Sequence, residues 1–424
     1  MAALSMIIPY PPSASTCGYC SPPGERSKTR SSYKAGSVIA VGPGLSCEVY
    51  QKMIDRGWRR SGTYCYKPDL RRSCCPQYTI RLDALEFKPS RSHRKLVHRW
   101  NRFILEGDSS DKMDGSQSSK PKVKGANNAS FHLISSIHES ERSFISDGES
   151  VHAFEVTLEP SSYTDEKFAL YEKYQAEIHM DFDNAPSGFK RFLVESPLQH
   201  ERISYPSQRP AHLPETYGSY HQLYRVDGQL IAMGVIDILP GCVSSVYFMY
   251  DKRWEKYSLG KLSAMRETAL TRELHDAGIS GLSSMYMGFY IHSCQKMRYK
   301  ADYSPSYLAD PEEYTWHSLD KCIPLLEENK YVCFSHPEHS IPHGAPIPER
   351  PAPPMLSDDE LQQINVFMKV EHRQIIVSPM NHSHGWDNVD TRKTVLYNID
   401  ALGIELSKEI LWFVHSNDGE SESE

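Results

Sequence analysis

The sequence predicts a mixed α/β (α+β) fold, and three features of its central region support that class: a β-hairpin signal, a further strand, and a helix followed by another strand. Residues 220–226 and 229–239 are rich in side chains favoured in strands, and Asp227-Gly228 between them suits a tight hairpin turn. Residues 243–250 predict a third strand. Strands combined with a helix in this order are typical of α/β proteins.

The helix is expected from about residue 259, where apolar side chains recur three and four residues apart, and a further apolar strand is expected at 285–291. This order of elements resembles the N-acetyltransferase (GNAT) superfamily, in which a glycine-rich loop at the helix start holds the pyrophosphate of CoA. Residues 255–261 contain one glycine, so no nucleotide cofactor is expected. The helix start either meets phosphate groups of a substrate or is an ordinary capped helix.

Four cysteines near the start of the chain are candidate metal ligands. Cys17 and Cys20 are separated by two residues, and Cys74 and Cys75 are adjacent. Two such pairs brought together supply the thiolates of a zinc site or an iron–sulfur cluster. The long interval between the pairs does not fit an ordinary zinc ribbon, so four reduced thiols in a small core are the alternative.

Several stretches of the chain resemble arginyl-tRNA-protein transferases, in the order expected for the N-terminal and C-terminal regions of that family. The resemblance covers roughly residues 14–105 and 150–320. The matching stretches are 55–62 (DRGWRRSG), 66–68 (YKP), 74–82 (CCPQYTIRL), 247–267, 290–300 (YIHSCQKMRYK) and 303–308 (YSPSYL).

The resemblance implies an arginyltransferase. Such an enzyme moves arginine from Arg-tRNA(Arg) to the α-amine of proteins that begin with Asp, Glu or oxidised Cys, which creates a degradation signal for the ubiquitin pathway. Because the arginyl ester is already activated, the transfer needs neither ATP nor a covalent enzyme intermediate. The alternatives are a non-catalytic, metal-stabilised module that binds tRNA or protein N-termini, and a CoA-dependent N-acetyltransferase.

This chemistry sets three recognition tasks. The arginyl guanidinium needs carboxylates, for which Asp237 and Asp251 near strand ends are candidates. An acidic peptide N-terminus needs cations, and Arg59, Arg60 and Arg81 are the candidates because arginine binds carboxylates in a bidentate manner. The tRNA acceptor end needs cations and stacking surfaces, which are interleaved in Tyr290, His292, Lys296, Arg298, Tyr299 and Lys300. Each assignment has a non-functional alternative. The two aspartates could be surface turn residues, the arginines solvated charges, and the tyrosines of 290–300 packed side chains.

The sequence does not identify a catalytic base. Glu267 on the expected helix, His179 and His292 are candidates, but none lies in a signature arrangement. Cys294 is better explained as a buried structural thiol, because an activated ester does not require a nucleophile.

Charge and composition suggest how the chain is divided. The 424 residues carry a net charge of −7, yet arginine and lysine gather at 56–72 and 91–102, which allows a basic patch on an acidic protein. No membrane segment or signal peptide is expected, so the predicted location is cytoplasm and nucleus. The predicted divisions are 1–107 (cysteine-rich basic module), 108–150 (flexible polar linker), 151–334 (GNAT-like catalytic region) and 335–424 (Pro/His-rich segment, short helix and acidic tail).

Overall fold

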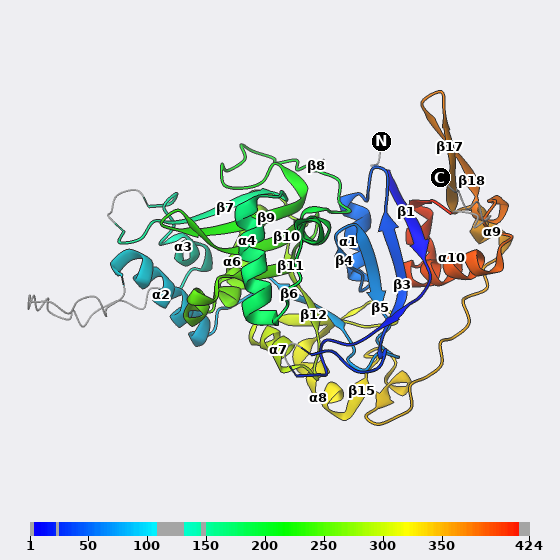
Figure 1. The fold of residues 1–424 in the computed structure, drawn as a ribbon, viewed down its shortest axis with the longest axis horizontal. Coiled ribbons are helices and arrows are strands. Elements are labelled where there is room, and N and C mark those ends of the chain that lie inside the picture. Colours follow the sequence, from blue (N-terminus) through cyan, green and yellow to red (C-terminus); the bar gives the residue numbers. More distant parts are fainter. Residues whose placement is uncertain (1–3, 23–24, 108–130, 146–149, 415–424) are drawn as a thin grey trace, which may run out of the picture.

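The computed structural model describes residues 4–22, 25–107, 131–145 and 150–414 and contains two large mixed β-sheets (Figure 1). We call them the terminal sheet, which holds the first and last described strands, and the central sheet. The mixed α/β class predicted from the sequence is confirmed. None of the described helices is long and apolar enough to cross a membrane.

The terminal sheet has the strand order β18–β17–β19–β1–β3–β5–β4, with β2 paired to β3. β1 pairs with β19 in parallel, with Ser5 opposite Ile410, and α10 packs against β1 and β3. The fully buried indoles of Trp58 and Trp412 fill the core beside this sheet. Its elements are β1 (Ser5–Tyr10), β2 (Ala14–Ser15), β3 (Ser32–Ala40), α1 (Cys47–Asp55), β4 (Arg59–Ser61), β5 (Tyr64–Pro68), α9 (Asp358–Gln362), β17 (Asn365–Glu371), β18 (Gln374–Pro379), α10 (Val389–Leu402), α11 (Ile404–Lys408) and β19 (Ile410–Trp412).

The central sheet has the strand order β14–β13–β6–β12–β11–β10–β9–β7, with β8 paired to β9. The predicted hairpin is β9 and β10, and the predicted third strand, helix and following strand are β11, α6 and β12. Its strands are β6 (Tyr78–Asp83), β7 (Phe154–Pro160), β8 (Glu201–Arg202), β9 (Thr216–Val226), β10 (Gln229–Ile238), β11 (Cys242–Tyr250), β12 (Ser284–Tyr290), β13 (Ser306–Ala309) and β14 (Trp316–Ser318).

Helices cover both faces of the central sheet. Along β10, Ala232 faces the core beneath α6, whereas Met233 and Val235 face the core beneath α4, as the period of two in a strand requires. The remaining elements are α2 (Arg91–Glu106), α3 (Leu133–His138), α4 (Asp165–Tyr174), α5 (Pro186–Phe189), α6 (Leu259–Asp276), α7 (Gln295–Arg298), α8 (Leu319–Glu328), β15 (Asn329–Tyr331) and β16 (Ile341–Pro342).

The structure corrects two of the predicted divisions. Residues 131–145 are not a linker, because Leu133 and Ile137 of α3 are buried in the same core as α2 and α6. The cysteine-rich module does not extend to residue 107, because β6 and α2 belong to the central sheet and its core. Residues 108–130, most of the predicted linker, and 415–424, the acidic tail, lie outside the described residues.

The short helix expected within residues 335–424 is α9, which spans five residues. Ser357 accepts a hydrogen bond from the backbone of Glu360, whose side chain returns to Ser357 in a capping box. The helix ends at Gln362, and residues 365–371 form β17, where β-branched and aromatic side chains favour a strand. β17 therefore lies next to β18, the edge strand of the terminal sheet.

A buried ion pair joins the two sheets. Arg60 on β4 donates to both carboxylate oxygens of Asp237 on β10, from Nε at 2.8 Å and from a terminal nitrogen at 2.7 Å. Their side chains are 1% and 0% exposed, and Ser219 on β9 also donates to Asp237 at 2.6 Å. A bidentate pair of this kind fixes both the distance and the direction between the partners.

We expect removal of one partner to be far more destabilising than removal of both. Arg60→Met or Asp237→Leu alone leaves a buried charge without its partner, which should lower the free energy of unfolding by about 3–5 kcal/mol. The double variant should lose clearly less than the sum of the two. Denaturant unfolding of the wild type, the two single variants and the double variant measures these free energies of unfolding. Lys52→Ala, which breaks an exposed pair with Glu409, is the control and should change stability by at most about 1 kcal/mol; additive effects of Arg60→Met and Asp237→Leu would contradict the coupling.

Candidate functional site

The four cysteines predicted as metal ligands come together in the structure. Their sulfur atoms all lie within 4.8 Å of one another, and those of Cys20 and Cys74 are 3.8 Å apart. Two sulfurs bound to one tetrahedral zinc, each at about 2.3 Å, stand roughly 3.8 Å apart, so the spacing fits a metal centre. Hydrogen bonds from Cys75, above all, and then from Ser31 lower the pKa of Cys74 to about 5, which favours the thiolate form that binds metal.

The cysteine set rests against the end of β12. Cys17 and Cys75 are buried and pack with Phe289, Ile291 and Cys294 in one apolar cluster. This contact ties the loops that carry the cysteines to the segment that follows β12.

A cavity of about 570 Å³, which we call the α6 pocket, opens where two parallel strands separate. β11 and β12 pair only through Cys242, Val243 and Ser244, although both strands continue further. The positive N-terminal end of α6 borders the opening. The volume suits a small substrate group. Its lining residues are Tyr174, Ser245, Phe248, Tyr250, Glu255, Ser258, Leu259, Gly260, Lys261, Ser263, Ala264, Glu267, Met285, Met287, Gln295, Lys296 and Tyr299.

Glu267 gives the α6 pocket a buried carboxyl group. It is 1% exposed, and its Oε1 accepts a hydrogen bond from Ser263 at 2.8 Å. Oε2 is buried and has no hydrogen-bond partner among the described residues. Burial raises the pKa of Glu267 to about 7, and the hydroxyl of Ser263 counters this rise only partly.

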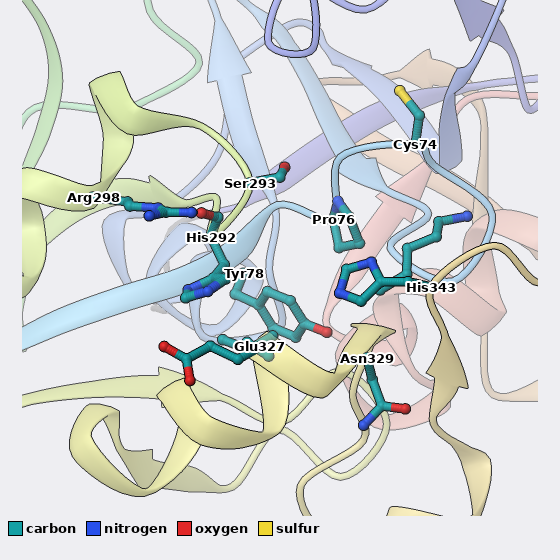
Figure 2. Close-up of a pocket in the computed structure, with 11 residues that line it drawn as sticks. Cys74, Pro76, Tyr78, His292, Ser293, Arg298, Glu327, Asn329 and His343 are labelled. Atoms are coloured by element: carbon teal, nitrogen blue, oxygen red, sulfur yellow. The ribbon is translucent and has the colours of Figure 1, made fainter.

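A second cavity, of about 450 Å³, lies beside the cysteine set, and we call it the cysteine-side pocket. Figure 2 shows Tyr78 in its middle, with His292, Arg298 and Glu327 on one side and His343 on the other. Basic side chains outnumber acidic ones around it. Its lining residues are Cys74, Pro76, Tyr78, His292, Ser293, Arg298, Leu326, Glu327, Asn329, Lys330 and His343.

The segment 292–299 lines both pockets. His292, Ser293 and Arg298 border the cysteine-side pocket, whereas Lys296 and Tyr299 border the α6 pocket. Nε of Arg298 donates to the carbonyl of His292 at 2.6 Å and closes this segment on itself. Two substrate groups bound in the two pockets would therefore be separated by one short stretch of chain.

Comparison with known proteins identifies the family. Residues 15–95 match the model described as "Arginine-tRNA-protein transferase, N terminus", and residues 166–310 match "Arginine-tRNA-protein transferase, C terminus". The chain belongs to the arginine-tRNA-protein transferase family. The predicted resemblance is confirmed. All lining residues of the α6 pocket lie in the second matched region, whereas the cysteine-side pocket combines residues of both regions with five that follow them, Leu326, Glu327, Asn329, Lys330 and His343.

Relatives of this transferase family member are named as arginyl- or leucyltransferases. "Arginyl-tRNA--protein transferase 1" of Drosophila melanogaster is 32% identical, over 78% of this chain and 85% of the relative. The protein of the same name from Arabidopsis thaliana is 30% identical, over 78% of this chain and 76% of the relative. "Aspartate/glutamate leucyltransferase" of Pseudomonas fluorescens is 26% identical, over 62% of this chain and 80% of the relative. The family thus consists of aminoacyltransferases whose names specify different amino acids.

A solved structure, the C-terminal domain of a putative lysylphosphatidylglycerol synthetase from Agrobacterium fabrum, is similar over 58% of this chain and 53% of that chain. Its TM-score is 0.24 at 13% identity, so it supports no argument about the fold of the transferase.

The residues predicted to hold the tRNA acceptor end divide into three groups. Lys296 and Tyr299 line the α6 pocket, and His292 and Arg298 line the cysteine-side pocket. Tyr290 and Lys300 are buried instead. The hydroxyl of Tyr290 contacts His292 Nδ1 at 3.1 Å, and Lys300 donates to the carbonyl of Phe289. These two residues support the segment from within and do not present stacking or phosphate-binding surfaces.

The predicted substrate-binding charges are likewise used inside the protein. Arg60 and Asp237 bind each other, and burial lowers the pKa of Arg59, which donates to backbone carbonyls including that of Gly288 at 3.0 Å. Burial acts to raise the pKa of Asp251, but hydrogen bonds from Arg253 and Lys173 outweigh it and lower this pKa to about 2.

The last of these charges, Arg81, stacks on Trp316 with 4.0 Å from Cζ to the ring centroid. None of the five predicted charges is among the lining residues of the α6 pocket or the cysteine-side pocket. Their roles in substrate binding therefore stay predictions, which neither of these two cavities supports.

The three candidate bases occupy different places. Glu267 lines the α6 pocket, His292 lines the cysteine-side pocket, and the ring of His179 lies 5.2 Å from that of Tyr174, which borders the α6 pocket. Burial, and to a lesser extent the charge of Lys296, lowers the pKa of His179. The lowered pKa favours the neutral form of its imidazole. Lys330 and His343 line the cysteine-side pocket but were not predicted, because no local motif distinguishes them.

Proposed function

We propose that this chain transfers arginine from Arg-tRNA(Arg) to the α-amine of proteins that begin with Asp, Glu or oxidised Cys, and so marks them for ubiquitin-dependent degradation in cytoplasm and nucleus. Membership of the arginine-tRNA-protein transferase family carries the proposal. The two pockets on either side of residues 292–299 support it, because the reaction brings together two different substrates.

The arginyl end of the tRNA is assigned to the α6 pocket, within a GNAT-like catalytic region. The positive end of α6 and the exposed Lys296 lie at this cavity, where they suit the phosphates and the ester oxygens of an acceptor end. The peptide α-amine attacks the ester carbonyl, the ribose oxygen leaves, and a proton moves from the amine toward that oxygen. Donors near the helix start would stabilise the developing oxyanion.

The body of the tRNA is assigned to the exposed face of α2. Trp100 of α2 packs on Tyr257 with 5.3 Å between ring centroids, and Tyr257 ends the turn that leads directly into α6. Arg99 on the basic face also lies 5.9 Å from the ring of Tyr257, so this part of the face is near the start of α6. Phosphates bind such exposed cations without sequence preference. The exposed cations of α2 are Arg91, Arg94, Lys95, Arg99 and Arg102.

The acidic N-terminal side chain of the protein substrate is assigned to the cysteine-side pocket. Arg298, Lys330 and His343 line this cavity, and Glu327 is the acidic residue among its lining side chains. Cations gathered in a concave, partly buried site bind a carboxylate or a sulfonate more strongly than isolated surface cations do. An oxidised cysteine carries such an acid group.

The four-cysteine set is assigned a structural metal, either zinc or an iron–sulfur cluster. Cys17, Cys20, Cys74 and Cys75 would hold it. Bound metal would fix the loops that pack on Phe289 and Ile291, and through them the segment 292–299.

Transfer of labelled arginine from Arg-tRNA to peptides that differ only in an N-terminal Asp or Ala tests the function. The wild-type protein should modify the Asp peptide. Lys330→Ala should raise KM for the Asp peptide about tenfold, as expected when one charge-assisted hydrogen bond is removed, and leave KM for Arg-tRNA unchanged. Lys321→Ala, an exposed lysine on α8, is the control. Wild-type protein that binds both substrates without transfer would favour a binding module, and turnover of acetyl-CoA would favour an acetyltransferase.

Salt-dependent tRNA binding tests the assignment of α2. Arg94→Ala combined with Arg102→Ala should weaken tRNA binding and reduce the slope of log K against log salt by about one for each phosphate that the variant no longer binds. Lys369→Ala combined with Lys393→Ala removes two exposed cations elsewhere and should change neither quantity. Equal slopes for the α2 variant and the wild type would contradict tRNA binding at α2.

Metal analysis tests the cysteine set. Protein purified without oxygen should contain bound zinc or iron, and visible absorbance should distinguish an iron–sulfur cluster from zinc. Cys74→Ser should lower the metal content, the thermal stability and the rate of arginine transfer together. Cys294→Ser alters a buried thiol of the same apolar cluster and should keep the metal. Wild-type protein that is folded and active with no metal would contradict the assignment.

A further inference from the structure

The carboxyl group of Glu267 lines the α6 pocket, and no cation of the described part of the chain forms an ion pair with it. Lys261, a cation at the same cavity, lies 3.3 Å from Asp302, and Lys296 is exposed. The next residue, Arg266, pairs with Glu141. No ion pair within 4 Å involves Glu267 among the described residues.

We propose that Glu267 determines the choice of amino acid, by accepting hydrogen bonds from the guanidinium of the arginyl group through Oε2. This inference rests on the proposed function. A buried carboxylate with one unpaired oxygen is unfavourable on its own, and a planar cation with several N–H donors supplies what it lacks. Leucine and other neutral side chains would leave the carboxylate unpaired in the filled pocket.

The burial of Glu267 prepares it for a cation. In the empty pocket the raised pKa, about 7, leaves the carboxyl group partly protonated near neutral pH. A bound guanidinium stabilises the ionised form and so draws the carboxyl group into the charge pair. Ser263 already holds Oε1 at 2.8 Å, so the carboxyl group is fixed in orientation before substrate arrives.

The remaining lining suits the rest of an arginine side chain. Leu259, Met285 and Met287 offer apolar contacts for its methylene groups. The rings of Phe248 and Tyr250 also line the cavity, and aromatic faces attract a guanidinium plane. The ester carbonyl is at the opposite end of the arginyl group from the guanidinium, so it would lie toward the opening.

In this role Glu267 does not act as the general base of the reaction. A carboxylate paired with the guanidinium cannot also take a proton from the α-amine that attacks at the other end of the arginyl group. Loss of a base would slow transfer of every amino acid alike, whereas loss of a selecting residue would change the ratio between amino acids. The family includes proteins named leucyltransferases, so its aminoacyl pocket has to distinguish charged from neutral side chains.

The test compares transfer from tRNA charged with arginine and tRNA charged with leucine to the same Asp peptide. In Glu267→Gln, the ratio of kcat/KM for arginine over leucine should fall about a hundredfold or more. Asp276→Asn removes the same charge from an exposed residue at the far end of α6, outside both pockets, and should change the ratio less than about twofold. Equal losses for both amino acids, or no loss, would overturn the proposal.

A binding measurement keeps this inference separate from the proposed function. Arginine amide and leucine amide carry the two side chains without tRNA, and their binding to the full-length protein can be followed by calorimetry. Arginine amide should bind the wild type and Asp276→Asn equally well but bind Glu267→Gln at least tenfold more weakly. If binding depends on Glu267 while the wild type transfers no arginine, the proposed function fails and the inference stands. Binding unaffected by Glu267→Gln would overturn it.

Discussion

A buried pair of opposite charges fixes β4 of the terminal sheet against β10 of the central sheet. Arg60 and Asp237 are both inaccessible to water, so neither can find another partner without exposing a charge to the apolar interior. Their bidentate geometry allows one arrangement of β4 against β10. The cysteine set belongs to the terminal-sheet side and packs on β12 of the central sheet, so its position also depends on this joint.

The segment 292–299 is the part of the molecule on which both proposed binding events converge. Its inner side is held by Tyr290 and Lys300, and the cysteine cluster packs against its start. Side chains of one short segment therefore face two cavities with different chemical character. In the proposed assignment, the two substrates contact the same segment, 292–299, from two different pockets. The buried side chains of Tyr290 and Lys300 hold this segment in place.

The elements predicted correctly from the sequence are those whose determinants are local. The Asp227-Gly228 turn and the apolar spacing of α6 act over a few residues, so β9, β10, β11, α6 and β12 could be placed. Long-range pairings could not. Arg60 and Asp237 are 177 residues apart, and nothing near either residue indicates that they neutralise each other. The four cysteines were recognisable because sulfur ligands come in pairs, whereas Lys330 and His343 join a pocket only through tertiary packing.

The parallel pairing of β1 with β19 has a consequence for synthesis of the chain. A ribosome adds roughly 5–20 residues per second, so β1 waits on the order of 20–80 seconds for its neighbour to be made. Throughout that interval one edge of β1 offers unpaired backbone groups, which invite incorrect association. The central sheet needs no segment beyond β14 and can form earlier. Nascent chains of this protein therefore pass through a stage with a complete central sheet and an unpaired edge of β1, which is the kind of surface that molecular chaperones bind.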